Sequence, residues 1–184
     1  MKKVMFLMAI VAIIVCSSCG NSTKPSKRVE LWGENLDTTS AVKKVTLSGE
    51  KVLVPFKRKE NGLAEVQISL NGTPFNMWWD TGASLTSISS LEFIKLIKEG
   101  KVSDADMLGT VSNSYADGSS GEETVYNIKE ILIQGKNNEY LRLNDVAVTV
   151  SENLGAPLLI GQNVIGNLPK HKFNDATEEI EFDK

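Results

Sequence analysis

The residues most able to do chemistry in this 184-residue chain form a short run around one aspartate. Asp80 follows the apolar run 73–79 and is followed at once by Thr81 and Gly82. A carboxylate at the end of an apolar strand is unusual, because burial penalises its charge, and such a residue is a candidate for function. Gly82 lets a backbone N–H approach the carboxylate, and the Thr81 hydroxyl can turn inward to fix the loop. An ordinary strand-end turn is the alternative interpretation.

Other groups that could take part in catalysis are sparse. His171 is the sole histidine and lies between Lys170 and Lys172, so a solvated strand edge is favoured over a catalytic triad. No cluster of histidine, cysteine and carboxylate residues has the spacing of metal ligands, so we expect no metal and no cofactor. Several acidic residues are interpreted as solvated charge: Asp104, Asp106, Glu122, Glu123, Glu178 and Glu179.

Alternating apolar residues predict the strands that must position Asp80. Residues 52–56 and 64–70 are expected as strands, the second of them half-buried. Asn71-Gly72 predicts a hairpin turn into a third strand at residues 73–79. Trp78 and Trp79 then face opposite ways, one into the core and one onto a cleft wall.

One helix and several more strands follow the Asp80 segment. Ser90 is a suitable N-cap for a helix over residues 91–99, and Gly100 is a suitable stop. Its apolar side is expected to consist of Leu91, Ile94, Leu96 and Ile97. Further strands are expected at residues 125–133, 140–150 and 158–160, and a turn with a final strand within residues 173–182. The chain is therefore predicted to be mostly β.

Composition excludes some classes of function. The chain has 41% hydrophobic and 23% charged residues with a formal net charge of −3, which fits a globular domain and disfavours nucleic-acid binding. The two cysteines, Cys16 and Cys19, both lie near the N-terminus, so the folded part can hold neither a disulfide nor a thiolate metal site.

The N-terminal residues look like an export signal. Two lysines precede twelve apolar residues at 4–15, a run too short to span a hydrocarbon core of about 30 Å. The following residues resemble a bacterial lipoprotein signal, in which Cys19 would carry the lipid; an ordinary cleaved signal is the alternative. We expect residues 1–19 to be this signal, residues 20–49 to be a polar tether and residues 50–184 to be the domain. The implied location is a bacterial cell membrane, on its periplasmic side or at the outer membrane.

Two segments resemble those of the retropepsin-like aspartic proteases, the retroviral-type aspartyl proteases. Residues 78–84, followed by residues 87–89, resemble the catalytic segment, in which two apolar residues precede Asp-Thr-Gly-Ala. Residues 157–165 resemble the family's paired aliphatic residues, glycine and short helix, which pack behind the catalytic loop. Residues 114–121 lie where the family has its flap, a glycine-containing hairpin that closes over a bound peptide.

The resemblance implies a single domain with a closed, β-barrel-type acid protease fold, one short helix after the catalytic loop and one near the C-terminus. It also implies a role for each matching residue. The catalytic residue is Asp80, its loop supports are Thr81, Gly82 and Ala83, the flap residues are Ala116, Asp117, Gly118 and Ser119, and the motif behind the loop includes Ile160, Gly161 and Asn163.

The implied activity is that of an aspartic endopeptidase acting on polypeptides. In this chemistry one ionised carboxylate takes a proton from water while a second, protonated one donates to the scissile carbonyl. Asp117 lacks the sequence context of Asp80 and is interpreted as a turn residue, so the second carboxylate is expected from Asp80 of another copy in a homodimer. The alternative functions are a non-catalytic relative that binds an extended peptide and a purely structural lipoprotein.

One departure from the family concerns the dimer contact. Retroviral members have an acidic residue at the position of Ser84 and an arginine at that of Gln162, and these form an ion pair. A hydrogen bond between Ser84 and Gln162 is the expected replacement, with a weaker dimer as the consequence.

Overall fold

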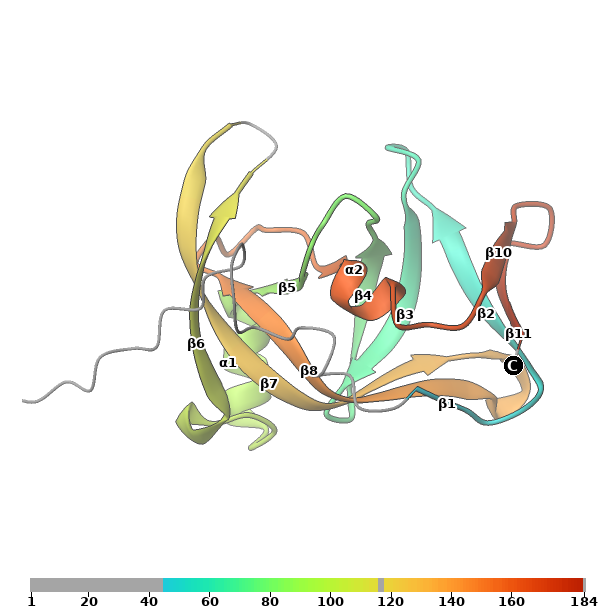
Figure 1. Cartoon of the computed structure of the whole chain (residues 1–184), viewed down its shortest axis with the longest axis horizontal. Helices are drawn as coiled ribbons and strands as arrows, with labels where there is room; N and C mark the ends of the chain where they lie inside the picture. The colour runs from blue at the N-terminus through green and yellow to red at the C-terminus, as the bar shows by residue number, and fades with distance from the viewer. Residues whose placement is uncertain (1–44, 116–117, 184) are drawn as a thin grey trace, which may run out of the picture.

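The computed structural model describes residues 45–115 and 118–183, and strands dominate them (Figure 1). The strands are β1 (Thr46–Leu47), β2 (Lys51–Arg58), β3 (Ala64–Leu70), β4 (Thr73–Trp79), β5 (Thr86–Ser89), β6 (Met107–Ser114), β7 (Ser120–Gln134), β8 (Tyr140–Ser151), β9 (Leu159–Ile160), β10 (His171–Asn174) and β11 (Glu179–Asp183). The helices are α1 (Ser90–Lys98) and α2 (Gln162–Ile165), and two 3₁₀ turns are η1 (Asp104–Asp106) and η2 (Lys136–Asn138). The predicted mostly β fold, with a helix after the Asp80 loop and one near the C-terminus, is confirmed.

The hairpin that leads to Asp80 forms as the sequence predicts. Residues of β3 alternate between buried and less buried, and β4 has the bounds expected from its apolar run. Asn71 and Gly72 both have positive φ, 48° and 87°, as a two-residue type I′ turn requires. Local residue preferences therefore fix the register that places Asp80 at the end of β4.

The pairing of distant strands encloses the core. Strands follow the order β10-β11-β2-β3-β4-β9-β5-β8-β7-β6, and β3 pairs with β7 as well, so the pairings from β3 through β4, β9, β5, β8 and β7 return to β3. β4 and β9 are parallel, with Trp79 beside Ile160. This pairing brings the residues after β4 against those that follow β9, and Figure 1 shows α2 beside the β4–β5 loop. Closure of the strands into a retropepsin-like barrel stays a prediction.

Helix α1 differs from its prediction in two ways. Its N-cap is Ser89, whose side chain accepts a hydrogen bond from the Leu91 N–H, and Ser90 is the first helical residue. Of the four residues expected on its apolar side, only Leu96 is buried. The other three are exposed: Leu91 57%, Ile94 43% and Ile97 45%. The helix is short and packs against the core through Leu96, so most of its predicted apolar side is left exposed.

The N-terminal boundary of the fold also differs from its prediction. Thr46 and Leu47 lie within the segment expected to be a tether, yet they pair with Arg142 and Leu141 of β8. The sheet thus begins before residue 50, because Val45 and Leu47 pack against the core. Cys19 and the rest of residues 1–44 lie outside the described residues. Within the described part, no helix is long and apolar enough to cross a membrane.

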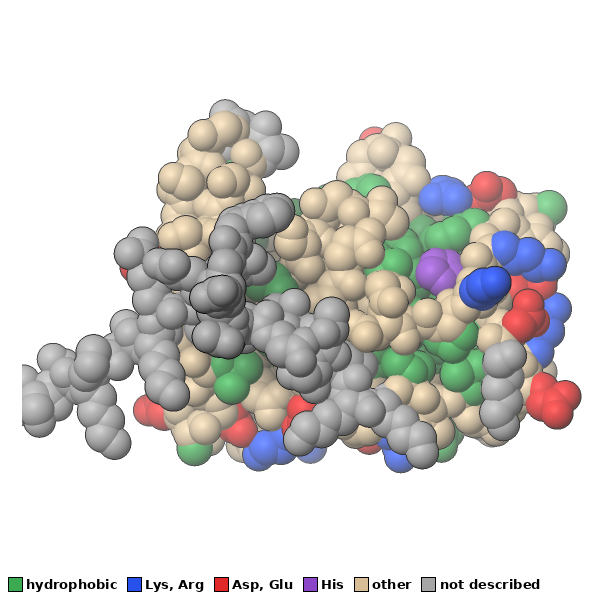
Figure 2. Space-filling model, viewed as in Figure 1, with side chains coloured by type: hydrophobic (Ala, Val, Ile, Leu, Met, Phe, Trp, Pro, Cys, Tyr) green, Lys and Arg blue, Asp and Glu red, His purple; other side chains and the backbone are tan. Residues whose placement is uncertain are grey.

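His171 lies on the edge strand β10, as predicted, but its half-buried ring packs in an aromatic cluster, which corrects the prediction of a solvated side chain. Its ring lies 5.3 Å from that of Trp79 and 5.1 Å from that of Phe182, between centroids. Figure 2 shows the purple histidine against hydrophobic side chains. Pairing of β10 with β11 turns His171 toward the core, and its Nδ1 lies 3.0 Å from the Pro169 carbonyl oxygen. His171 therefore has a structural role, because its ring packs against these aromatic side chains.

Candidate active site

Asp80 is half-buried and held by backbone groups on both sides. Its N–H donates to the Ile160 carbonyl at 3.1 Å, which continues the β4–β9 pairing. Its carboxylate Oδ1 accepts a hydrogen bond from the Gly82 N–H at 2.8 Å, and its carbonyl accepts from the Ala83 N–H at 3.3 Å. A Cβ on Gly82 would lie 3.1 Å from Oδ1, so a glycine here leaves room for the carboxylate. The backbone N–H groups of Gly82 and Ala83 thus both bind Asp80 within this loop.

Thr81 contributes to the loop through its backbone. The residue is exposed, and its carbonyl accepts a hydrogen bond from the Gln162 side-chain amide at 3.0 Å. The expected hydrogen bond between Ser84 and Gln162 side chains is therefore replaced by another contact. The Gln162 backbone N–H also donates to the Ala83 carbonyl at 2.8 Å, so Gln162 binds two carbonyl groups of the Asp80 loop.

Gly161 and Asn163 contact the end of the Asp80 loop. A Cβ on Gly161 would lie 2.3 Å from the Leu85 carbonyl carbon, so only glycine permits this approach. The Gly161 N–H donates to the Thr86 hydroxyl at 3.1 Å. Asn163 binds Thr86 through its side-chain oxygen and the Ala147 carbonyl through its side-chain nitrogen. The end of the loop, at the start of β5, is thus fastened to α2 and through Asn163 to β8, which both lie far away in the sequence.

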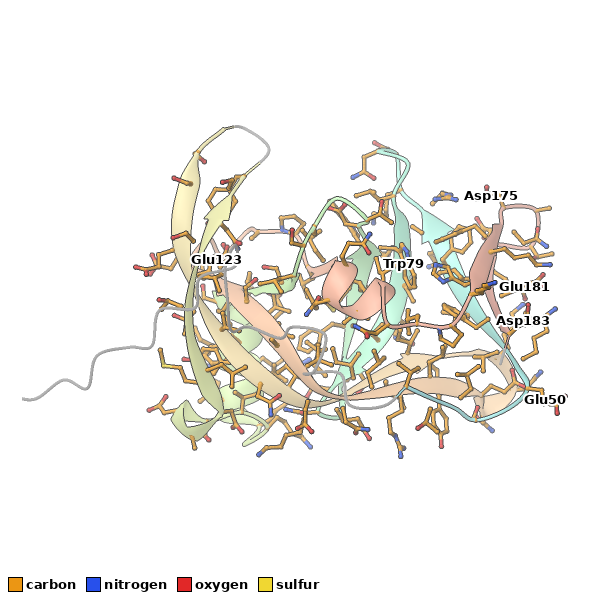
Figure 3. All side chains as sticks on the ribbon, viewed as in Figure 1. Glu50, Trp79, Glu123, Asp175, Glu181 and Asp183 are labelled. Carbon is orange, nitrogen blue, oxygen red and sulfur yellow. The ribbon has the colours of Figure 1, made fainter. Side chains whose placement is uncertain are left out.

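A cleft of about 580 Å³ opens beside Asp80. It lies between the loop after β4 and the β6–β7 hairpin; Figure 3 labels Glu123 on that hairpin and Trp79, the residue before Asp80. Its lining residues are Asp80, Gly82, Ala83, Ser84, Leu85, Ser87, Ser112, Asn113, Ser114, Tyr115, Glu123, Thr149 and Leu159. The charged side chains among them are two carboxylates, Asp80 and Glu123. Neither forms an ion pair with a lysine or arginine of the described residues.

The hairpin predicted as a flap is present, but other residues of it line the cleft. The Tyr115 N–H donates to the Ser119 carbonyl at 2.8 Å, and Gly118 takes a positive φ of 84° at the tip. Gly118 and Ser119 are exposed and do not line the cleft. Ala116 and Asp117 lie outside the described residues. On the hairpin side, the cleft is lined by residues 112–115 and Glu123. Of these, residues 114 and 115 belong to the predicted flap segment, whereas Ser112, Asn113 and Glu123 were not expected at the site.

Glu123 is not solvated charge, which corrects the prediction. It is 4% exposed and pairs across the hairpin with the buried Val111. The signal for this burial is present in the sequence: Glu123 lies two residues before Val125, and alternate residues of a strand share a face. Similarly, Glu179 is 8% exposed and forms an ion pair with Lys136.

The two tryptophans do not divide between core and cleft as predicted. Trp79 is buried in the core, and Trp78 is half-buried beside Arg58 and Lys59 at another surface. Neither lines the cleft around Asp80. Among residues 45–115 and 118–183, no group of three or more histidine, cysteine or carboxylate residues is placed to hold a metal ion.

The chain is similar to solved structures but not to any family model or curated protein. No protein-family model matches the chain, and no curated protein matches it. Among solved structures, the chain is similar to a retropepsin-like aspartic protease from Rickettsia conorii. The identity is 11% and the TM-score 0.48, over 75% of this chain and 91% of that one. The function must therefore be argued from the site itself.

Proposed function

We propose that this chain is an aspartic endopeptidase with a retropepsin-like fold. The observation that supports this most is the placement of Asp80. Its half-buried carboxylate lines a cleft large enough for several side chains, and a backbone N–H holds it from within its own loop. The Asp-Thr-Gly-Ala sequence and the glycine segment that packs behind it agree with the same activity.

The proposed reaction is hydrolysis by a pair of carboxylates. The ionised carboxylate takes a proton from a water molecule, whose oxygen attacks the scissile carbonyl carbon. The protonated carboxylate donates its proton to the carbonyl oxygen, and breakdown of the tetrahedral intermediate returns a proton to the leaving amine. Two like charges at close range share one proton, which separates these two roles.

The second carboxylate comes from Asp80 of another copy in this proposal. Glu123 is the other acidic residue among the described lining residues of the cleft, but hydrogen bonds fix its carboxylate to the wall of the hairpin. A two-fold axis beside the Asp80 loops brings two identical carboxylates together. The proposed active species is therefore a homodimer.

Substitution of Asp80 tests the proposed activity. Asp80→Asn should abolish cleavage of a quenched fluorescent peptide library, because the amide can neither accept the water proton nor share one with its partner. Asp104→Asn is the matched control, since Asp104 is an exposed residue outside the cleft. Equal activity of wild type and Asp80→Asn, or no cleavage by the wild type, would contradict the proposal. Peptide binding without cleavage would favour the non-catalytic alternative.

We also propose that the chain is exported and lipid-anchored through Cys19 to a bacterial cell membrane, at its periplasmic face or the outer membrane. The support is the sequence alone, which places Cys19 after a lysine pair, an apolar run and two serines. Detergent-phase partitioning tests the anchor. Wild type should enter the detergent phase and Cys19→Ser should leave it, whereas a Cys19→Ser protein that still partitions into detergent would contradict the anchor.

A further inference from the structure

Glu123 is a buried carboxylate in a cleft wall that offers it no positive charge. Its side chain is almost fully withdrawn from solvent, yet it belongs to the lining of the cleft beside Asp80. Val111, opposite it on β6, and Val125, two residues further along β7, are buried in a small apolar cluster with Leu85. Burial of a carboxylate in such surroundings is costly unless other groups compensate its charge.

Neutral donors hold this carboxylate in a fixed orientation. Its Oε2 accepts a hydrogen bond from the Asn113 side-chain amide, and its Oε1 accepts one from the Tyr115 hydroxyl at 3.2 Å. A Cβ on Gly121 would lie 2.7 Å from the Tyr115 hydroxyl oxygen, so glycine at 121 leaves the space that this ring occupies. The hairpin therefore positions the carboxylate but does not neutralise it.

Each oxygen of Glu123 retains capacity for another donor. A carboxylate oxygen has two lone pairs, and each oxygen here accepts one hydrogen bond from the residues that the structure describes. A guanidinium group can donate to both oxygens at once, and an ammonium group can donate to one. Because Asp80 is the other charged residue among the described residues of the cleft lining, the field that these residues produce inside the cleft favours a cation.

We infer that Glu123 is a specificity-determining residue that binds an arginine or lysine side chain of the peptide substrate, arginine more tightly. This inference rests on the proposed peptidase function and names its substrate class: polypeptides with a basic residue close to the scissile bond. In a two-fold dimer each subunit contributes one Glu123, so a basic residue is favoured on either side of that bond.

Paired peptides test this assignment. One peptide of each pair carries arginine, and the other carries citrulline, its neutral isostere, at successive positions around the scissile bond. At the best position, the wild type should cleave the arginine peptide with a kcat/KM about 10- to 100-fold higher, the size expected for one charged hydrogen-bonded pair. Glu123→Gln should bring this ratio close to one. Glu122→Gln is the matched control, since Glu122 lies on the exposed face of β7 and binds Thr110, and it should keep the wild-type ratio.

Several outcomes would overturn the assignment. One is an equal kcat/KM ratio of arginine to citrulline peptides in wild type and Glu123→Gln, and another is no preference for arginine at any peptide position. A third is loss of all cleavage by Glu123→Gln with unchanged peptide binding, which would make Glu123 a catalytic residue. If Glu123→Gln does not fold, Glu123→Asp serves as the test. Its carboxylate is one methylene group shorter and cannot reach the same position on the arginine side chain, so the kcat/KM ratio of the arginine peptide to the citrulline peptide should fall several-fold, and an unchanged ratio would refute the assignment.

Binding measurements separate this inference from the proposed catalysis. Fluorescence anisotropy with labelled peptides reports affinity in the Asp80→Asn protein, which needs no turnover. Suppose that the wild type cleaves no peptide, that Asp80→Asn binds the arginine peptide more tightly than the citrulline peptide, and that adding Glu123→Gln removes this difference in affinity. The proposed activity then fails, and the proposed subsite stands. Equal affinity for both peptides overturns the subsite whatever happens to catalysis.

Discussion

The side-chain oxygen of Asn163 accepts two hydrogen bonds from Thr86, one from its backbone N–H at 2.8 Å and one from its hydroxyl at 2.9 Å. The side-chain nitrogen of Asn163 donates to the Ala147 carbonyl at 2.7 Å. One residue of α2 thus joins β5, just after the Asp80 loop, to β8. The geometry of the candidate site depends on this contact as much as on the loop itself.

Asn163→Ala should lower the free energy of unfolding by about 2–3 kcal/mol, because it leaves the buried Thr86 N–H without its acceptor. Urea denaturation measures the change. Asn76→Ala, at an exposed residue of β4, is the control and should change stability by less than about 0.5 kcal/mol. Similar stability of the two variants would mean that this contact contributes little.

Gly161→Ala should cost about 3 kcal/mol or more, because the new methyl group meets backbone atoms of Leu85 and Thr86 that cannot rotate away. Gly155→Ala is the matched control, since the nearest atom to its Cβ would be the Asn153 Oδ1 at 3.7 Å, an ordinary contact. Thermal unfolding of both variants checks this. Equal melting temperatures of Gly161→Ala and Gly155→Ala would contradict the close approach at Gly161.

Ser89→Ala should destabilise the protein by about 1 kcal/mol, the usual loss for a helix N-cap. Ser89 is fully buried and caps the Leu91 N–H, whereas Ser90 makes one exposed hydrogen bond to the Glu152 carbonyl at 3.3 Å. Ser90→Ala should therefore cost less. Equilibrium unfolding of the pair decides the position of the cap, and a larger loss for Ser90→Ala would place it at residue 90.

Acid should destabilise the fold through Glu181. Hydrogen bonds from Lys51 and Lys172, at 2.8 and 3.1 Å, lower the pKa of Glu181, and the one from Lys136 lowers that of Glu179. Since the folded pKa lies below the unfolded value of about 4.3, this stability is present above that pH and is lost as pH falls through the folded pKa.

The melting temperature of the wild type should accordingly fall more than that of Glu181→Gln as pH drops from about 5 to 3. Glu60→Gln, at an exposed loop residue, is the control and should follow the wild type. Parallel curves for wild type and Glu181→Gln would show that these ion pairs do not contribute.

Excess Asp80→Asn protein should inhibit the wild type by forming inactive heterodimers, if activity requires one Asp80 from each of two subunits. With nine parts of variant to one of wild type and free exchange, the activity per wild-type subunit should fall about tenfold, because few wild-type subunits then meet each other. The same mass of serum albumin is the control. Constant specific activity on dilution, with a monomer in sedimentation, would contradict the homodimer.

The sequence by itself determined the features that depend on neighbouring residues. Alternation along residues 64–70, positive φ at Asn71 and Gly72, and the apolar run 73–79 place Asp80 at a strand end, because strand periodicity and turn geometry are local properties. The short helix after Gly161, by contrast, is expected from the family resemblance and not from a local pattern, and it is present as α2. The catalytic role of Asp80 stays a prediction.

Only the tertiary structure decided which face each element presents to the rest of the molecule. Glu123, His171 and the exposed side chains of α1 all differ from their predictions, because burial depends on strands and turns distant in the sequence. The hydrogen bonds of the Gln162 side chain to Thr81 and of the Asn163 side chain to Thr86 depend on the parallel pairing of β4 with β9, which brings these segments together. Such strand pairings join residues about eighty positions apart, and no local sequence pattern identifies the partner strand.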